Sequence, residues 1–215
     1  MMLARDAAIT ILDFESTGVV EGFANEPWQI GMVFFQDGKI QPQYTFSSLL
    51  RVGDRPFNRY APGRHALLRE KIAQAPTMQE LWIQLSPWLS GHPLGAHSIP
   101  TEKKFLGEAF PLHPFGPWVD TLKLVRVAYP EMASHKLEDV IVSLELRDMV
   151  QAFCPDGQPH DALYDAVACA VLLEFLLQLP EWRDVPLNAL IRARATNYHQ
   201  MRSARAAAKL GRHNL

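Results

Sequence analysis

The chain has 215 residues, of which 48% are hydrophobic and 20% charged, and its formal net charge is -2 at pH 7. This length suits one well-buried domain and is short for two, and the charge argues against the overall basic surface of a general nucleic-acid binder. No run resembles a membrane span, and the N-terminus lacks the pattern of a signal peptide. Two cysteines make neither a disulfide framework nor a metal-ligand spacing. We therefore expect a cytoplasmic chain with reduced thiols and no membrane partner.

The first part of the chain predicts an antiparallel meander of three strands. Residues Ala8 to Leu12 are nearly all apolar, which is typical of a central strand covered on both faces. Two further β-rich segments, Trp28–Phe35 and Gln43–Leu50, flank the dipeptide Asp37-Gly38. This dipeptide between apolar runs indicates a hairpin turn.

After residue 64 the pattern changes to helices separated by short strands. Start signals of helices recur along this part, including a T-x-x-E capping box. The expected elements are a helix from about His65 to Ala73, a helix opened by Thr77 and Glu80, a strand at Leu94–His97, a helix over Thr101–Glu108 started by Ser98 and Pro100, a strand at Trp118–Leu122, a helix through Val127, a helix capped by Ser134, and an apolar helix over Ala162–Leu179.

The end of the chain differs from the rest in charge. From Pro186 onward there are six Lys and Arg residues and no acid, and residues 188–210 favour a helix. We expect a main domain over residues 1–180 and a basic helical extension over 181–215. The extension either binds an acidic partner or packs on the domain with its arginines facing water.

Two carboxylates, Asp13 and Glu15, interrupt the first strand. Side chains alternate between the faces of a strand, so both acids lie on one side, after Ile9 and Ile11. Close carboxylates repel one another, and a divalent cation relieves that repulsion. The simpler interpretation is that the strand ends here in a solvated turn before Gly18.

A second acidic position lies in the apolar helix near residue 165. Asp165 is costly to bury there unless it is paired or binds a metal, although it is also favourable near the solvated start of the helix. His160 precedes this helix in a loop with Gly157 and Pro159, where it is either a surface residue or a proton acceptor. One helical turn separates His160 from Asp165, so the two can serve one site.

Taken together, three motifs resemble those of the DEDDh (DnaQ-like) 3'-5' exonucleases. The motifs are Asp13-x-Glu15-Ser16-Thr17-Gly18, Ala96-His97 followed by Glu102, and His160-x4-Asp165. The resemblance covers roughly residues 8–180, and it implies that the main domain is an exonuclease domain. It also implies an α/β fold of the ribonuclease-H-like type, with a mixed five-stranded sheet whose first three strands are antiparallel, flanked by helices.

The resemblance also implies a site and a reaction. Two Mg2+ or Mn2+ ions would be held by the metal ligands Asp13, Glu15, Glu102 and Asp165, since hard oxygen ligands suit these ions. His160 would deprotonate the water that attacks the terminal phosphodiester of a single-stranded DNA or RNA 3' end, which yields 5'-mononucleotides. His97 is expected to be structural. The candidate substrate contacts are Phe14, Thr17, Gly18 and Val19, each of which is equally a candidate for plain packing.

One position departs from the family pattern. The second motif usually reads H-N-x-x-F-D, whereas this chain reads His97-Ser98-Ile99-Pro100-Thr101-Glu102. Glu102 keeps the charge but moves its oxygens by about a bond length, and the geometry around Mg2+ is strict. Glu102 is alternatively an ordinary acid in the first turn of a surface helix. The second function in view is therefore an exonuclease-fold module that binds nucleic acid or a protein partner with impaired catalysis.

Overall fold

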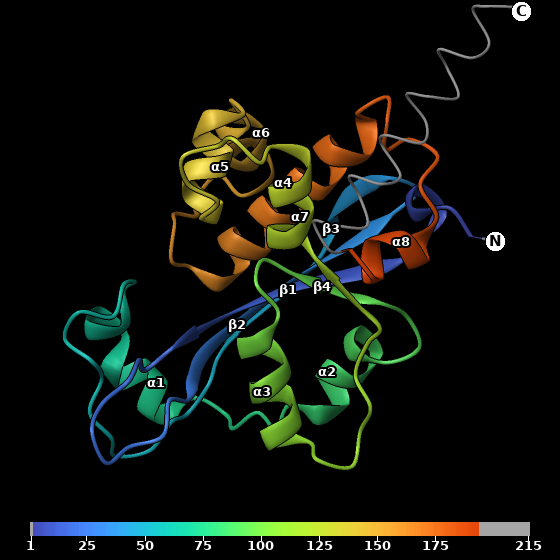
Figure 1. Cartoon of the computed structure of the whole chain (residues 1–215). Helices are drawn as coiled ribbons and strands as arrows, with labels where there is room; N and C mark the ends of the chain where they lie inside the picture. The colour runs from blue at the N-terminus through green and yellow to red at the C-terminus, as the bar shows by residue number, and fades with distance from the viewer. Residues whose placement is uncertain (1, 194–215) are drawn as a thin grey trace, which may run out of the picture.

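The computed structural model describes residues 2–193 and contains one mixed five-stranded sheet between two layers of helices (Figure 1). The strand order is β3-β2-β1-β4-β5, in which β1 pairs antiparallel with β2 and parallel with β4. This arrangement confirms the predicted fold class, including the antiparallel first three strands. The strands are β1 (Ile9–Ser16), β2 (Pro27–Gln36), β3 (Lys39–Leu49), β4 (Leu94–Ala96) and β5 (Trp118–Asp120).

The helices fall on two sides of the sheet. Helices α4 to α7 cover one face, and α2 and α3 cover the other (Figure 1). Helix α7 is buried nearly all round and contacts β1, β2 and β3. The α-helices are α1 (Arg69–Gln74), α2 (Trp82–Leu89), α3 (Pro100–Ala109), α4 (Thr121–Ala128), α5 (Leu137–Ser143), α6 (Arg147–Phe153), α7 (Ala162–Gln178) and α8 (Leu187–Ile191), with 3-10 turns η1 (Ala4–Asp6) and η2 (His65–Leu68).

The two faces of strand β1 pack in two different apolar cores. Ile9 and Ile11 pack in the core that contains α7, whereas Leu12 and Phe14 pack in the core that contains α2 and α3. This alternation follows from the two-residue period of a strand. It places Asp13 on the α7 side of the sheet.

The hairpin between β2 and β3 has the predicted turn. Asp37 and Gly38 have φ values of 54° and 72°, and Gln36 pairs with Lys39. A two-residue turn with positive φ at both central positions matches the twist of antiparallel strands. The turn signal in the sequence is therefore confirmed.

Two of the predicted helix starts differ from the structure. Thr77 and Glu80 form the reciprocal hydrogen bonds of a capping box, with the Glu80 N–H donating to Thr77 Oγ1 at 3.2 Å, but α2 begins only at Trp82. The prediction that Ser98 caps α3 is wrong. Ser98 has a φ of 78° and its N–H donates to Asp120 Oδ1 at 3.2 Å, so Ile99 is the N-cap of α3.

Two smaller differences concern the segment after α4. Lys136, not Ser134, is the N-cap of α5, because the Ser134 hydroxyl accepts from the Lys136 N–H at 3.3 Å while donating to Asp139. Helix α6, over Arg147–Phe153, was not predicted. It is short, and only Val150 is fully buried, so its apolar periodicity is weak.

The first residues of the predicted extension pack on the main core. Trp182, Val185 and Leu190 belong to the same cluster as α7, and Leu187 N–H donates to Met2 O at 3.1 Å. The helix expected over 188–210 ends at Ile191 in the described residues, where it is α8; residues from 194 onward, with five of the six cations, lie outside the described part. Within residues 2–193, no helix has the length and apolar character needed to span a membrane.

Candidate active site

The end of β1 meets the start of α7 because a glycine on β2 allows close approach. Gly31 is the antiparallel partner of Asp13, and a Cβ on Gly31 would lie 2.2 Å from backbone atoms of Ala162 and Leu163. A glycine inside a strand often marks such a contact between backbones. The first turn of α7, with Asp165, is thereby placed beside the acids of β1.

The loop before α7 is fixed by hydrogen bonds to acidic side chains. The Asp161 carboxylate accepts from the Leu163 N–H at 3.2 Å and caps α7. His160 has a φ of 64°, and its N–H donates to Asp165 Oδ2 at 3.0 Å. One potential ligand atom from each of Glu15, His160 and Asp165 lies within 4.8 Å of the other two.

Glu102 lies in the first turn of α3, at the end of the parallel strand β4. It is only 5% exposed, and its Oε2 atom is buried without a hydrogen-bond partner. An unpartnered buried carboxylate oxygen is costly unless something positive binds to it. Glu102 is therefore not an ordinary acid on a surface helix.

Burial raises the pKa of every acid in this set, and the charges of nearby acids raise it further. The pKa of Asp13 is well above its usual range because of burial and the charges of Asp165, Glu15 and Glu102. Burial, followed by the charge of Asp165, raises the pKa of Glu15 to about 8. Burial likewise raises the pKa of Glu102 to about 7. It also raises the pKa of Asp165 to about 7, although the hydrogen bond from His160 lowers it. The four carboxylates thus favour a neutralising partner.

The donor set fits divalent cations. None of the ion pairs among residues 2–193 involves Asp13, Glu15, Glu102 or Asp165, so no Lys or Arg of the described part neutralises them. Carboxylate oxygens are the ligands that Mg2+ and Mn2+ prefer. The three-residue group of Glu15, His160 and Asp165 does not include Asp13 or Glu102; the charges of Asp165, Glu15 and Glu102 act on Asp13.

His97 has the structural role that the sequence suggested. Its Nε2–H donates to His135 O at 2.8 Å, which leaves Nδ1 to accept from the Thr121 hydroxyl at 3.0 Å. Both ring nitrogens are therefore used within the protein. The histidine ties the end of β4 to the start of α4 and to the segment before α5.

The four candidate substrate contacts lie in different environments. Thr17 is 1% exposed, and its hydroxyl accepts from the Glu26 N–H at 3.1 Å. Gly18 has a φ of 74°, and Val19 is 79% exposed. Phe14 is 7% exposed and packs edge-on against Phe105 at 5.6 Å, on the α3 side of the sheet. Val19 is accessible to a ligand, and the roles of all four residues stay predictions.

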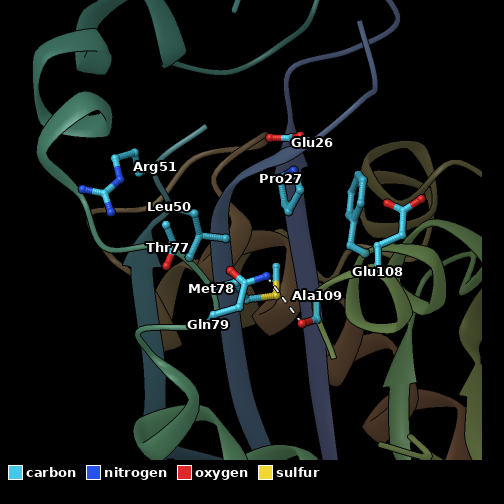
Figure 2. A pocket seen from close by; sticks show the side chains of 10 residues that line it. Glu26, Pro27, Leu50, Arg51, Thr77, Met78, Gln79, Glu108 and Ala109 are labelled. Atoms are coloured by element: carbon cyan, nitrogen blue, oxygen red, sulfur yellow. Dashed lines mark hydrogen bonds between the residues drawn. The ribbon is translucent and has the colours of Figure 1, made fainter. Parts of the chain in front are cut away.

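A separate pocket of about 300 Å³ lies on the α3 side, between the start of β2 and the C-terminal half of α3 (Figure 2). Phe105 forms part of its wall, and the Gln79 amide donates to Ala109 O across it at 3.4 Å. Its described lining includes none of the predicted site residues. Asp13 lies on the other face of the sheet, beside α7, while Glu102 lies at the opposite end of α3 from the pocket.

Sequence reasoning missed three residues that shape the site. Gly31 sets the approach of α7, Asp161 caps that helix, and Arg64 forms an ion pair with Asp161 at 2.9 Å. Asp161 was detectable as an N-cap residue before the apolar helix, and Gly31 as a glycine inside a strand. The ion pair had no local signal, because Arg64 comes from a loop far away in the sequence.

Relatives of this chain include polymerase-associated and DinG-type proteins. It is 27% identical over 177 residues to a DNA polymerase III subunit epsilon-like protein of Rhodobacter capsulatus, covering 79% of this chain and 23% of that protein. It is 26% identical over 184 residues to the 3'-5' exonuclease DinG of Staphylococcus haemolyticus, covering 84% and 19%. The chain thus spans less than a quarter of the length of these relatives.

Solved structures share the fold. The nuclease domain of 3'hExo, a DEDDh family member bound to rAMP, superposes with a TM-score of 0.64 at 19% identity, covering 82% of this chain and 94% of that one. Pop2p of S. pombe, in a form with Mg2+ and Mn2+ bound, gives a TM-score of 0.64 at 15% identity, covering 87% and 89%.

This sheet, with acids at the C-terminal end of β1 and at the starts of α3 and α7, has the ribonuclease-H-like fold. The exonuclease family model RNase_T matches residues 10–173, and the chain belongs to this family as a DEDDh, DnaQ-like member.

Proposed function

We propose that the chain is a metal-dependent 3'-5' exonuclease that releases 5'-mononucleotides from single-stranded ends of DNA or RNA. One observation carries the proposal: Glu15 and Asp165 lie beside His160, the charges of Glu15, Glu102 and Asp165 act on the buried Asp13, and none of these acids has a Lys or Arg partner in residues 2–193. The name of the Staphylococcus haemolyticus relative supports the 3'-5' direction.

The four acids would hold two Mg2+ or Mn2+ ions. When bound, such ions supply Lewis-acid stabilisation of the charge on the reacting phosphate and the leaving oxygen. The Mg2+- and Mn2+-bound form of Pop2p supports this choice of metals. Glu102 would contribute the Oε2 atom, which has no hydrogen-bond partner among residues 2–193.

His160 would act as the general base. Its side chain is exposed and lies within 4.8 Å of Glu15 and Asp165, and its backbone is held by the bond to Asp165. The imidazole takes a proton from the attacking water, the new P–O bond forms, and the bond from phosphorus to the 3' oxygen breaks. The leaving oxygen gains a proton from solvent, so the products are a 5'-mononucleotide and a strand shortened by one residue.

The turn after β1 would receive the terminal nucleotide. Thr17 is buried and its backbone groups are bonded to Glu26 and Asn58, so it would shape the turn, whereas the half-buried Gly18 and the exposed side chain of Val19 would contact the nucleotide. Contacts of this kind do not read sequence, which suits an enzyme that trims arbitrary ends. The rAMP bound to the nuclease domain of 3'hExo supports a nucleotide as the ligand.

The direct test uses single-stranded DNA and RNA oligonucleotides of matched sequence, labelled at either the 3' or the 5' end. In Mg2+ or Mn2+, but not in EDTA, we expect the 3' label to be released as a mononucleotide. The 5'-labelled strand should shorten one nucleotide at a time. The Asp13→Asn variant removes one ligand charge and should be inactive. Equal activity of this variant, or release of 5' label first, would contradict the proposal.

A second function, nucleic-acid binding with little turnover, is favoured by Glu102 in place of the usual Asp. It predicts that the chain binds oligonucleotides with a steep salt dependence but neither binds Mn2+ nor cuts. Calorimetric titration of Mn2+ into the metal-free protein separates the two functions. Binding of Mn2+ supports the exonuclease, and no binding supports the second function.

A further inference from the structure

Residues 58–63 form a bridge between the two sides of the acid cluster. At one end, the Asn58 backbone N–H donates to Thr17 O at 2.8 Å, and its side-chain Nδ2 donates to Val19 O at 2.9 Å. At the other end, a Cβ on Gly63 would lie 2.9 Å from His160 O. The bridge therefore runs from the turn after Glu15 to the loop of the proposed general base.

The middle of this bridge presents an aromatic ring and a guanidinium to solvent. Tyr60 is 76% exposed, and its backbone N–H donates to Asn58 Oδ1 at 2.9 Å. The Arg59 guanidinium carbon lies 4.5 Å from the centre of the Tyr60 ring, and Arg59 Nη2 also donates to the Tyr60 hydroxyl. The pair is thus organised locally, on a backbone that the hydrogen bonds of Asn58 hold in place.

Arg59 differs from the other arginines of its loop. Arg51 pairs with Glu80, Arg55 with Glu26, and Arg64 with Asp161. Among the ion pairs of the described chain, none involves Arg59, so its charge is available to an outside anion. A guanidinium that is free of such pairs can bind a phosphate of the strand that leads to the acids.

We propose that Arg59 and Tyr60 form the binding site for the nucleotide on the 5' side of the scissile phosphate. The exposed ring stacks on that nucleotide's base, and the guanidinium pairs with its phosphate. Stacking on an aromatic ring accepts any base, and a guanidinium recognises phosphate without reading sequence. The inference rests on the proposed exonuclease function, since it places the strand relative to the acids and His160.

Two substrates that differ only on the 5' side of the reacting phosphate test the site. One is a single-stranded oligonucleotide, and the other is the p-nitrophenyl ester of thymidine 5'-monophosphate, in which p-nitrophenol replaces the upstream strand as leaving group. We expect Tyr60→Ala to raise the KM for the oligonucleotide about 10-fold, while kcat/KM for the ester stays at the wild-type value. Tyr60→Phe keeps the stacking surface and should restore the KM to within about two-fold of wild type.

The matched control is Tyr44→Ala, because Tyr44 is also an exposed tyrosine, 59% accessible, but lies on β3 away from the acids. This variant should leave the kinetic constants for both substrates at their wild-type values. Arg59→Ala should flatten the dependence of log KM for the oligonucleotide on log salt by about 0.7, the value for one phosphate contact of a single strand. Equal losses on both substrates in Tyr60→Ala, or no loss on the oligonucleotide, would overturn the proposal.

A binding measurement separates this proposal from the proposed function. If wild-type protein cleaves neither substrate, the exonuclease proposal fails, and fluorescence anisotropy with a labelled oligonucleotide in Ca2+ still tests the site. A Kd that rises about 10-fold in Tyr60→Ala and not in Tyr44→Ala supports the upstream nucleotide site. An unchanged Kd in Tyr60→Ala would show that Tyr60 does not form such a site.

Discussion

Arg64 and Asp161 form an ion pair in which Nη2 of the arginine lies 2.9 Å from Oδ2 of the aspartate. Asp161 also caps α7 and directly follows His160, so the pair connects the loop of residues 51–64 to the proposed general base. Because the arginine is 44% exposed, the pair contributes little to global stability, about 0.5 kcal/mol. Its effect is on where His160 lies.

Breaking this pair should lower turnover without unfolding the protein. Asp161→Asn keeps an N-cap side chain but loses the charge, and Arg64→Ala removes the partner. We expect each variant to lower kcat about 10-fold, because a small displacement of the base weakens proton transfer. The double variant should be no worse than either single one, since both remove the same interaction.

Steady-state kinetics on one oligonucleotide, with thermal denaturation alongside, complete that double-mutant cycle. The control is Arg5→Ala, which breaks an ion pair of the same 2.9 Å length with Asp184, near the start of β1. It should leave kcat unchanged. Additive losses in Arg64→Ala/Asp161→Asn would show that the two residues act independently, contrary to this prediction.

Glu102→Gln should change how the stability of the metal-free protein depends on pH. Glu102 has a pKa of about 7 in the folded protein, above its usual 4.5, so its stabilising contribution is complete below pH 4.5 and is lost as the pH rises through 7. Glutamine stays neutral. At pH 8 the free energy of unfolding of the variant should therefore exceed that of wild type by on the order of 2 kcal/mol, which raises its denaturant midpoint. At pH 4.5 the two proteins should be equally stable.

Addition of Mn2+ should reverse that order. Metal that binds only the folded state stabilises wild type according to its affinity, and the variant, lacking one ligand charge, gains less. Urea denaturation at pH 8 with and without Mn2+ measures both effects. A metal-free variant less stable than wild type at pH 8 would show that Glu102 has a favourable partner within the protein.

Glu102→Asp should raise activity in Mg2+. The shorter side chain restores the residue usual in the family, and Mg2+ tolerates misplaced ligands less well than larger ions. We expect kcat to rise about 10-fold in Mg2+ and less in Mn2+. Rates of the variant and of wild type are measured in both metals on the same 3'-labelled strand. If the ratio of the rate in Mg2+ to the rate in Mn2+ is the same for both proteins, Glu102 does not limit the geometry of the metal site.

Gly31→Ala should displace the start of α7 from the sheet. The added methyl group would lie 2.2 Å from backbone atoms of Ala162 and Leu163, which are not free to rotate away. We expect a loss of about 3 kcal/mol in the free energy of unfolding together with loss of activity. Gly107→Ala in α3 is the control: its Cβ meets nothing within 4 Å, and it should gain about 0.5 to 1 kcal/mol.

The elements that could be predicted are those encoded by short stretches of sequence. The Asp37-Gly38 turn and the apolar runs of β1 and α7 depend on local conformation and periodicity, and the structure confirms them. The same alternation that puts Asp13 and Glu15 on one face places Phe14 on the other, against Phe105. That consequence was available from the sequence and was not used.

The features that could not be predicted depend on contacts between distant segments. The backbone N–H of Ser98 bonds to Asp120 from the next strand, and this overrides its preference for a helix cap. Arg64 meets Asp161 across 97 positions of the chain. Glu102 could be identified as an acid at a helix start, but its buried, unpartnered oxygen depends on how α3 packs against β1.

The sheet order also separates the proposed ligands by when they can assemble. Asp13 and Glu15 lie in the antiparallel part built from neighbouring hairpins, which closes over short loops, whereas Glu102 and Asp165 arrive only after β4 has inserted in parallel beside β1 and α7 has docked. A nascent or truncated chain that ends before α7 therefore lacks Asp165, one of the four proposed metal ligands. If the proposed ligands act together, hydrolysis would be confined to the fully folded chain, and incomplete copies would not degrade nucleic acid.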